Sequence, residues 1–470
     1  MSGELPAPPA ALFPARDTRE RLSDLLTRLL EAARERVAAG SVTPTFDRER
    51  FRAELRSFDF AAPMPLEELL RWSIEQLEHG VVHLTHPRYF GLFNPAPTFP
   101  AECADRIAGS FNPQLASSGS SPAPVEIEAH VVRALALRAG LPEGAGGHFT
   151  TSGSEANYTA LVCALTRAEP RFALEGVRGF AGPVAMYTSR ECQPAWFKIA
   201  HQAGIGRAAL RLIDTDERGR LHLPALAETL ARDRQAGTVP VLISATAGTT
   251  GGGAIDPLAG CAELARRCGA WYHVDAAWGG AALASERLRP LLAGIELADS
   301  ITIDAHKWFA TTMACGMFVT AHPQVLAEAF RVSADFMPSS VSGLDPYLNT
   351  VQWSRRFMGL RLFLALAAAG WGGYGVHLER ASELILTVRT RLLARGWSAL
   401  NDPRLAVLCV VPPAGSAPVR EIARRVVAGG RAWVAATTFA GHEAVRICAT
   451  HGEAAVADVE ALVEALEAAR

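Results

Sequence analysis

Apolar residues recur at helical spacing in two stretches near the start of the chain. In residues 18–39, TRERLSDLLTRLLEAARERVAA, and in residues 65–80, PLEELLRWSIEQLEHG, apolar side chains follow one another at intervals of three and four positions. This spacing places them on one face of a helix, and Gly80 is a typical end for the second helix. The two helices predict an N-terminal helical arm, to which we assign residues 1–85.

Between about residues 123 and 330 the pattern changes to short apolar runs separated by helical segments. Strands that are apolar throughout and are joined by helices are typical of a mostly parallel sheet covered on both faces. We therefore expect a large α/β domain over residues 86–375. The predicted strands are PVAMYTS, AALRLID, VPVLISAT, WYHVDAA, SITIDA and GMFVTA, and two of the helices are LPALAETLARDRQAG and DPLAGCAELARRCGA.

The end of the chain predicts a smaller C-terminal α/β domain, residues 376–470. A long helical stretch to about residue 397 precedes two strands, RLAVLCVV and AVRICAT, and a closing helix, EAAVADVEALVEALEAA. The segment SADFMPSSVSGLDPYLNT, residues 333–350, is rich in Gly, Ser and Pro and interrupts the pattern. It predicts a mobile loop.

Composition narrows the class of function. The chain has 470 residues, of which 49% are hydrophobic and 20% charged, and a net charge of −2, which favours a soluble globular protein without a basic face for nucleic acid. Eight cysteines without a C-x-x-C pair fit neither a zinc site nor a disulfide framework. No segment resembles a secretion leader or a membrane span. We expect a cytoplasmic protein that acts on small molecules and binds no metal, nucleic acid or membrane.

Candidate chemistry lies just after the predicted strands, where open α/β sheets bind ligands. In TTSGSEAN, residues 150–157, Ser152, Gly153 and Ser154 precede a helix, whose first backbone N–H groups could hold a phosphate. The alternative is an ordinary helix cap in which Ser152 and Glu155 form a capping box. In SATAGTTGGGAIDP, residues 244–257, small residues would let a flat ligand approach the backbone, although many strand-to-helix turns look alike.

Two charged residues at strand ends make the pattern more specific. Asp275 ends the strand of YHVDAAWGGA and needs a cationic or donor partner, which could be a protonated pyridine nitrogen or an arginine. Lys307, 32 residues later in SITIDAHKWFATTMACG, could form a Schiff base or could be a surface lysine. Together, a phosphate cradle, a carboxylate and a lysine at neighbouring strand ends predict a site for pyridoxal 5'-phosphate (PLP).

These motifs give the chain a family resemblance over most of its length. It is similar to the PLP-dependent group II amino-acid decarboxylases, the family of the aromatic amino-acid and glutamate decarboxylases. The resemblance implies a fold-type-I enzyme with a seven-stranded-type sheet, acting as a homodimer with shared active sites. The matching stretches are THPRYFGLFNP, SSPAPVEIE, GSEAN, HVDAAWGG, DAHKWF, AFRVSADFM, SRRF and EAVRICAT.

The resemblance also implies roles for individual residues. Lys307 would be the Schiff-base lysine, Asp275 would pair with the pyridine nitrogen, and Ala277 would pack on the ring. The remaining cofactor contacts would be Ser152, Gly153 and Ser154 at the phosphate, Thr250 and Asp256 near the ring, His306 next to the phosphate and the imine, and Asp304. The substrate pocket would include Leu92, Phe93, Gln114, Leu115, Ser117, Phe336 and Arg446.

Two positions depart from the aromatic decarboxylases. Where those enzymes stack a histidine on the cofactor, YTSRECQPAWFKIAHQAGIG has Gln193, as bacterial glutamate decarboxylases do, and the next histidine is His201. Where they carry a loop tyrosine that gives a proton to Cα, FRVSADFM has Phe336, 29 residues beyond Lys307. Phenylalanine has no proton to give. Plant members of the family with this exchange make aldehydes.

The sequence therefore predicts decarboxylation of an amino acid, with diversion to an aldehyde by oxidative deamination. Alternatives remain open. Tyr347 or His201 could supply the proton, so that the product is an amine. A β-elimination that cleaves a C–S bond would need no proton donor at Cα, and an idle partner protein with the family fold is a non-enzymatic alternative. The predicted pocket residues near the N-terminal segment lack a cation for a second carboxylate, which favours a neutral substrate.

Overall fold

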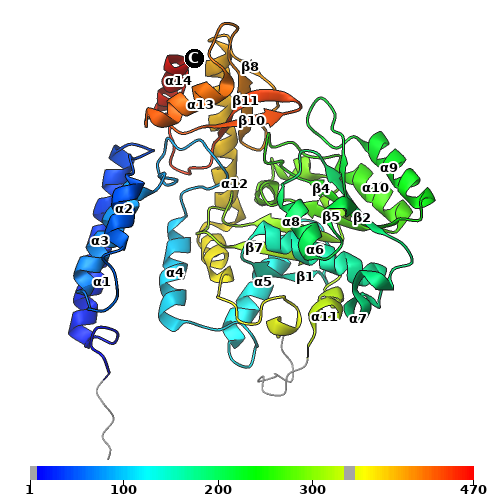
Figure 1. Cartoon of the computed structure of the whole chain (residues 1–470), viewed down its shortest axis with the longest axis horizontal. Coiled ribbons are helices and arrows are strands. Elements are labelled where there is room, and N and C mark those ends of the chain that lie inside the picture. Colours follow the sequence, from blue (N-terminus) through cyan, green and yellow to red (C-terminus); the bar gives the residue numbers. More distant parts are fainter. Residues whose placement is uncertain (1–7, 333–344) are drawn as a thin grey trace, which may run out of the picture.

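A seven-stranded sheet forms the centre of the molecule in the computed structural model, which describes residues 8–332 and 345–470 (Figure 1). Its strand order is β1-β7-β6-β5-β4-β2-β3, and the pairs that include β7 are antiparallel whereas the others are parallel. This confirms the predicted mostly parallel sheet. The strands are β1 (Gly146–Thr150), β2 (Val184–Ser189), β3 (Leu210–Ile213), β4 (Val239–Thr246), β5 (Trp271–Asp275), β6 (Ser300–Asp304) and β7 (Gly316–Thr320).

The six strands predicted in this region are all present, and β1 is an addition. Its sequence, GGHFT, has one strongly apolar residue, Phe149, so that hydrophobic patterning does not reveal it. It lies at the edge of the sheet and pairs with β7. The strands need Gly147 there, because its φ is 146° and a Cβ would lie 2.0 Å from the carbonyl oxygen of Phe318.

Helices cover both faces of the sheet. One hydrophobic cluster joins α5, α9, α10 and α12 to one face, and a second joins α6, α8 and α11 to the other. The predicted helices α9 and α10 are confirmed. The bounds are α4 (Phe99–Phe111), α5 (Pro122–Arg138), α6 (Gly153–Ala168), α7 (Phe172–Glu175), α8 (Ala195–Gln202), α9 (Leu223–Gln235), α10 (Leu258–Cys268), α11 (Gln324–Phe330) and α12 (Gly359–Leu393).

A second sheet lies in the C-terminal part of the chain (Figure 1). It is antiparallel, with the order β10-β11-β9-β8, and includes both predicted strands. Helix α12 continues across positions 375 and 376, with a break in its dihedral angles at Gly370, and the assigned domain boundaries stay a prediction. The elements are β8 (Ser398–Ala399), β9 (Val407–Val411), α13 (Val419–Ala428), β10 (Ala435–Phe439), β11 (His442–Cys448) and α14 (Val456–Ala469).

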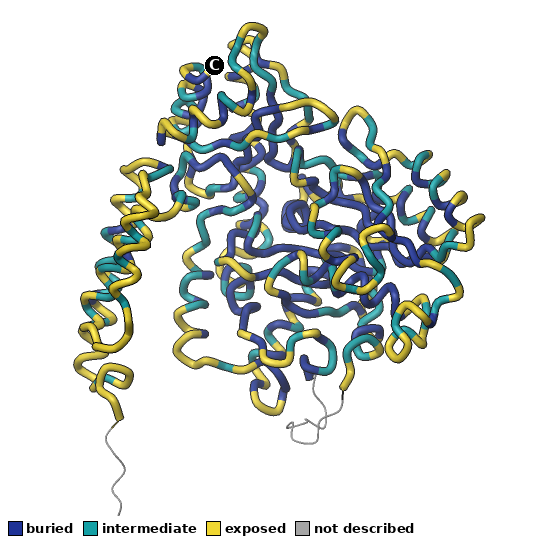
Figure 2. Tube along the Cα trace, viewed as in Figure 1, coloured by how far each residue is buried: buried dark blue, intermediate teal, exposed yellow. Residues whose placement is uncertain are grey.

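The N-terminal helices form an arm along one side of the molecule (Figure 1). The two predicted helices are α1 (Arg16–Ala39) and α3 (Leu66–Gly80), and the short α2 (Arg48–Leu55) lies between them in the sequence. Much of the arm is exposed to solvent (Figure 2), including the apolar side chains of Leu30 and Leu77. The arm therefore carries apolar surface that this chain does not cover.

Part of the predicted mobile loop is packed against the body. Within residues 333–350, positions 345–350 are described, and Tyr347 among them is buried with its backbone N–H donating to the carbonyl of Ala116 at 3.0 Å. Asp345 accepts a 3.0 Å hydrogen bond from the backbone N–H of Ser118. These contacts hold residues 345–350 against the body, whereas Phe336 lies outside the described residues.

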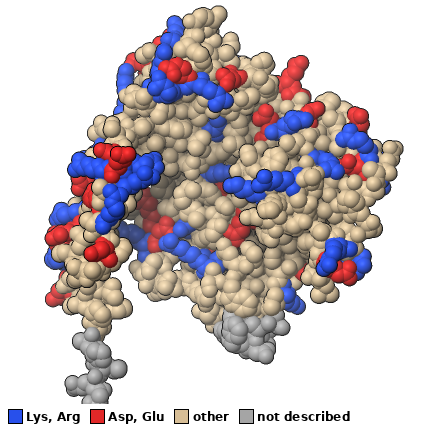
Figure 3. Space-filling view, viewed as in Figure 1, with Lys and Arg blue, Asp and Glu red and all other residues tan. Residues whose placement is uncertain are grey.

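The surface carries charges of both signs, as expected from the small net charge. Basic and acidic side chains are interspersed over the face seen in Figure 3. All eight cysteines fall in the described part of the chain and are free thiols. Among the helices of residues 8–332 and 345–470, none has the length and apolar character needed to cross a bilayer.

Candidate active site

The carboxyl ends of the central strands bring the candidate residues together at one edge of the sheet. Thr246 ends β4 and lies opposite Asp275, which ends β5. Asp304 ends the next strand, β6, and Lys307 follows in the turn after it. Strand-end residues that are far apart in the sequence are therefore neighbours, as expected for a parallel sheet.

Asp275 is a buried carboxylate held by neutral donors. Its Oδ2 accepts a 2.8 Å hydrogen bond from the side-chain amide of Asn157, and its Oδ1 accepts a 3.2 Å bond from the backbone N–H of Ala277. Burial raises the pKa of Asp275, while the charge of Lys307 and the bond from Asn157 lower it. Among the ion pairs of the described residues there is none between Asp275 and an arginine, so the arginine alternative is not found.

Lys307 is mostly buried and has a partner. Its Nζ lies 3.0 Å from Oδ2 of Asp304, and the Lys307 side chain is 22% exposed. The ring of His306 lies beside the carboxylate of Asp304, with its Nε2 3.8 Å from Oδ2. The Nδ1 of His306 accepts a 3.2 Å hydrogen bond from the backbone N–H of Cys315. Lys307 is therefore not a surface lysine, and its neighbours hold it at the strand end.

The predicted phosphate cradle is the start of helix α6. Ser152 is the N-cap residue, but its side chain makes no capping hydrogen bond. The carboxylate of Glu155 instead accepts bonds from the backbone and hydroxyl of Thr151, at 2.8 and 2.6 Å, so the alternative of a capping box is not found. A Cβ at Gly153 would lie 2.8 Å from Oδ2 of Asp304. The glycine thus lets the helix start close to Asp304. The first N–H groups of a helix have no carbonyl partner one turn earlier and can bind an anion.

A cavity of about 600 Å³ lies beside the helix start and brings Ser154 together with Gln193. The Gln193 side-chain oxygen accepts a hydrogen bond from the backbone N–H of Ala195, which fixes the side chain at the start of α8. Lys198, one turn further along α8, lines the same cavity. A cation, Lys198, and a carboxylate, Glu155, therefore line the same cavity as Ser154 of the predicted anion cradle.

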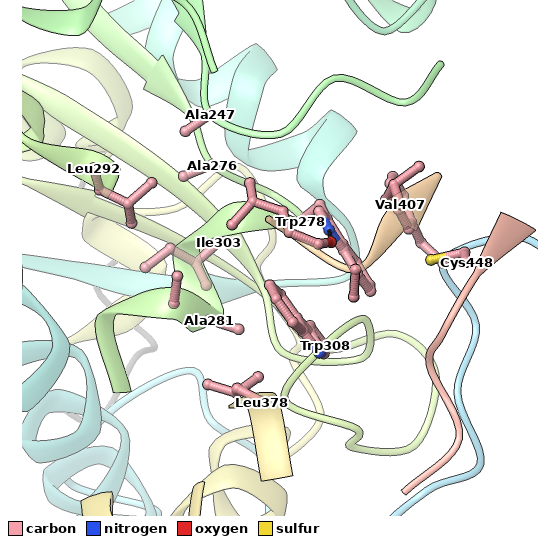
Figure 4. Close-up of a cluster of buried hydrophobic side chains, with 14 of the residues drawn as sticks. Ala247, Ala276, Trp278, Ala281, Leu292, Ile303, Trp308, Leu378, Val407 and Cys448 are labelled. Carbon is pink, nitrogen blue, oxygen red and sulfur yellow. Dashed lines mark hydrogen bonds between the residues drawn. The ribbon is translucent and has the colours of Figure 1, made fainter. Parts of the chain in front are cut away.

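A stack of flat side chains borders Lys307 on the other side. The rings of Trp308 and Trp278 are parallel, with centroids 4.8 Å apart, and Phe93 stacks on Trp278 at 4.0 Å. The guanidinium carbon of Arg446 lies 4.5 Å from the centre of the Phe93 ring, and Lys307 Nζ lies 5.8 Å from it. Figure 4 shows the two tryptophans side by side within the buried cluster. The stack connects Arg446 of β11 to the strand ends.

Arg446 is buried and incompletely paired. Its Nε donates to the carbonyl of Thr250 at 2.7 Å, and its Nη1 donates to the carbonyl of Gly91 at 2.5 Å. Its Nη2 is buried without a hydrogen-bond partner among the described residues. Thr250 is exposed, and the bond that it forms with Arg446 is through its backbone carbonyl. An unpaired guanidinium nitrogen beside the strand ends is suited to a carboxylate ligand.

Several other predicted site residues have packing roles in this structure. Asp256 is buried, and its two carboxyl oxygens accept backbone N–H bonds from Leu221 and Thr246, each at 2.7 Å. Burial raises the pKa of Asp256 to about 7. Leu115 is fully buried in a hydrophobic cluster, and the hydroxyl of Ser117 bonds with that of Ser120 at 3.2 Å. These side chains therefore pack against or bond to other residues of the chain.

The two other residues predicted near the N-terminal segment lie at the surface. Gln114 is exposed, and its side-chain amide donates to the hydroxyl of Ser354 at 3.1 Å. Leu92 is also exposed, whereas the neighbouring Phe93 points into the aromatic stack. Ala277, two residues after Asp275, is buried.

Sequence reasoning missed polar residues that adjoin these strand ends. Asn157, on the first turns of α6, donates to Asp275, and Thr246 lies beside Asp275 at the end of β4. Both residues lie in stretches whose other residues were predicted to bind the cofactor. Thr246 could have been found by the rule that picked Asp275, since it also ends an apolar strand, but the position of Asn157 depends on how α6 crosses the sheet.

The residues at this edge fit PLP. Three buried side-chain atoms at the strand ends have no hydrogen-bond partner among the described residues: Thr246 Oγ1, Ser189 Oγ and Asp304 Oδ1. Buried polar atoms are seldom left unpaired, so the site is built for a polar ligand. A lysine amine, a carboxylate and a helix start match the aldehyde, ring nitrogen and phosphate of PLP. This fold and this set of residues define a PLP-dependent enzyme of fold type I.

Comparison with known proteins gives the family. Residues 56–401 match the sequence pattern described as the pyridoxal-dependent decarboxylase conserved domain, which is most of the chain. The chain belongs to this family of decarboxylases, whose cofactor is PLP.

Three relatives illustrate how far the likeness extends. The acidic amino acid decarboxylase GADL1 of Mus musculus is 31% identical over 343 residues, which are 71% of this chain and 62% of that protein. The cysteine sulfinic acid decarboxylase of Mus musculus is 33% identical over 345 residues, 71% of this chain and 69% of that protein. The crystal structure of Oryza sativa TDC with PLP and tryptamine has a TM-score of 0.90 and 25% identity, and covers 97% of this chain and 98% of that chain.

Proposed function

We propose that this protein decarboxylates an amino acid at Cα, with PLP attached to Lys307. The observation that carries the proposal is the buried group formed by Lys307, Asp304 and Asp275 at adjoining strand ends. When bound, PLP withdraws electrons from Cα of an attached amino acid, so that the bond to its carboxylate can break. An amino acid with a neutral side chain is the proposed substrate class.

The chain's own residues would position the cofactor. The start of α6, with Ser152, Gly153 and Ser154, binds the phosphate through backbone N–H groups. Asp275 holds a proton on the ring nitrogen, and Ala277 supports the ring. Asp304 holds Lys307 by the 3.0 Å ion pair until its amine is used.

Arg446 would bind and orient the substrate. Its burial, its contact with Phe93 and its unpaired Nη2 support a role as the partner of the substrate's carboxylate. Because the two carbonyl bonds to Thr250 and Gly91 fix the guanidinium, a carboxylate bound there has a defined direction from Lys307. Directed binding decides which bond at Cα is broken.

The proposed product includes an aldehyde. After loss of carbon dioxide, Cα needs a proton to give an amine, and Phe336 and Gln193 offer no acid at the two positions where aromatic decarboxylases have one. Dioxygen then accepts two electrons from the decarboxylated carbon and becomes hydrogen peroxide, and water releases the nitrogen as ammonia. In sum, amino acid, dioxygen and water give aldehyde, carbon dioxide, ammonia and hydrogen peroxide.

Replacing Phe336 by tyrosine should shift the products toward the amine. A phenol at this position can donate the proton, and general acid catalysis contributes about 10² to 10⁴ in rate. The ratio of amine to aldehyde, measured by mass spectrometry in air, should rise strongly in Phe336→Tyr and stay unchanged in Phe172→Tyr, a control on the remote helix α7. Amine as the sole product of the unaltered enzyme in air would rule out the aldehyde branch.

The proposed function is tested by offering a panel of aromatic, aliphatic, thioether and acidic amino acids with and without oxygen. Decarboxylation predicts carbon dioxide from at least one of them, with oxygen uptake and peroxide in air. Loss of a β-substituent with the carboxylate retained would favour elimination instead. A PLP absorbance band that does not respond to any amino acid would favour an idle protein.

A homodimer is the proposed assembly, and it rests on the N-terminal arm. Leu30 of α1 and Leu77 of α3 are 47% and 60% exposed, and a second subunit would bury them. Light scattering at micromolar concentration should give twice the mass of one chain. Leu30→Glu with Leu77→Glu should shift the mass toward one chain, while Leu174→Glu, at a 92% exposed site outside the arm, should not. A monomer in the unaltered protein would contradict this.

A further inference from the structure

Behind Asp275 lies a continuous chain of buried polar side chains. Asn157, which donates to Asp275, accepts at its Oδ1 a 3.0 Å bond from Nε2 of His273. The other ring nitrogen of His273, Nδ1, lies 2.8 Å from the hydroxyl of Ser300, and that hydroxyl accepts a 2.8 Å bond from the indole N–H of Trp271. None of these side chains takes part in the steps described above.

The strands explain why these residues meet. Trp271, His273 and Asp275 alternate along β5 and therefore share one face of the sheet. Ser300 is opposite His273 in the neighbouring β6, on the same face. Helix α6 lies over this face and supplies Asn157 from above.

The chemistry of the two ends fixes the direction of every bond between them. An indole N–H only donates, and an ionised carboxylate only accepts. Ser300 accepts from Trp271, and among the described residues Nδ1 of His273 is the acceptor left for the Ser300 hydroxyl proton. His273 is then protonated at Nε2 and donates to Asn157, whose amide N–H is left for Asp275. Burial lowers the pKa of His273 to about 3, so the ring is neutral and has one proton.

The orientation of Asn157 matters because its amide has two ends. If it were reversed, its oxygen would face the carboxylate of Asp275, and a buried carboxylate facing an oxygen takes up a proton. Two donors on the far side prevent this reversal: Nε2 of His273 and the hydroxyl of Thr302, which bonds Oδ1 of Asn157 at 2.7 Å. The amide can satisfy both donors only with its N–H groups toward Asp275.

We propose that His273 is a positioning residue that, through Asn157, holds Asp275 as an ionised partner for the ring nitrogen of PLP. This inference rests on the proposed function, since it assumes that Asp275 pairs with that nitrogen. Ser300 takes part by fixing which nitrogen of His273 carries the proton. The sequence shows this arrangement as W-x-H-x-D in β5 beside S-x-T-x-D in β6.

The test compares the binding of PLP with that of its 1-deaza analogue, in which a C–H group replaces the ring nitrogen. The unaltered protein, freed of cofactor, should bind PLP more tightly than the analogue, because only PLP can pair with Asp275. In His273→Phe this preference should fall about tenfold, the size of one hydrogen bond to a charged group. His273→Gln, which keeps a donor near Nε2, should restore it.

Controls separate this inference from general damage and from the proposed function. His148→Phe removes another buried histidine of the same sheet, and should leave the preference unchanged. Ser300→Ala, a smaller change, should also reduce the preference. It takes the place of His273→Phe in the test if that variant does not fold. An unchanged preference in folded His273→Phe or Ser300→Ala would overturn the inference alone, whereas no preference for PLP in the unaltered protein would overturn the pairing of Asp275 that the proposed function assumes.

Discussion

Lys307→Ala should lose both the visible absorbance of bound PLP and all turnover of amino acids. Lys307 lies 3.0 Å from Asp304 at the end of β6, and an alanine there has no amine to join to the cofactor aldehyde. The loss should be complete within detection, because no other lysine lies at the strand ends. The measurement is the absorbance spectrum of the purified protein with PLP, followed by product analysis.

The sequence offers a matched control for this variant. The chain contains two lysines, Lys307 and Lys198. Lys198 is exposed in the neighbouring cavity, and Lys198→Arg keeps its charge but removes its amine. Reduction of the loaded protein with borohydride should therefore attach the cofactor to the peptide that contains Lys307, in the unaltered protein and in Lys198→Arg. Normal turnover by Lys307→Ala would refute the assignment of the site.

Asp275→Asn should keep the fold but lose most of the rate. Asparagine has the shape of aspartate and can still accept the bond from Asn157, so thermal unfolding should change little. It cannot balance the charge of a protonated ring nitrogen, and loss of one preorganised electrostatic partner costs about 10² to 10³ in turnover. The measurement is turnover at saturating substrate, beside the unfolding temperature.

Asp256 provides a control that separates the loss of charge at the cofactor ring from the loss of a buried charge elsewhere. Asp256 is also buried, but its oxygens bind the backbone of Leu221 and Thr246. We expect Asp256→Asn to lower the unfolding temperature, since one of its oxygens becomes an amide facing an N–H group. Asp275→Asn should instead change the absorbance of bound PLP. Full turnover in Asp275→Asn would exclude a role for Asp275 at the ring nitrogen.

The sequence predicts the central strands and two of the site residues for a simple physical reason. The strands of a buried parallel sheet are apolar throughout, so Asp275 and the turn with Lys307 are conspicuous where the apolar runs stop. The edge strand β1 was missed because GGHFT lacks that pattern, and its place depends on pairing with β7. Hydrophobic patterning predicts strands that are buried on both faces. It does not predict an edge strand such as β1, which forms because it pairs with a neighbouring strand.

Contacts between distant segments account for what the sequence leaves out of the site. Asn157, which the sequence did not indicate, reaches Asp275 across 118 positions. Arg446 was named by the family resemblance, but its bond to the carbonyl of Gly91, 355 positions away, was not. Asp256 follows the Gly-rich turn, a position typical of a residue that contacts a ligand. Both of its carboxyl oxygens nevertheless accept hydrogen bonds from backbone N–H groups. Which polar side chain is free for a ligand is decided by such bonds, and they are visible only in the folded chain.

Carboxyl-labelled substrates show whether an amino acid loses its carboxylate at this site. The PLP-loaded protein is incubated in air with a panel of amino acids labelled at the carboxyl carbon, with Lys307→Ala in parallel. For the true substrate, we expect the label to leave as carbon dioxide in an amount equal to amine plus aldehyde, and we expect Lys307→Ala to release none. Label retained in the turnover products of the unaltered protein would contradict this expectation.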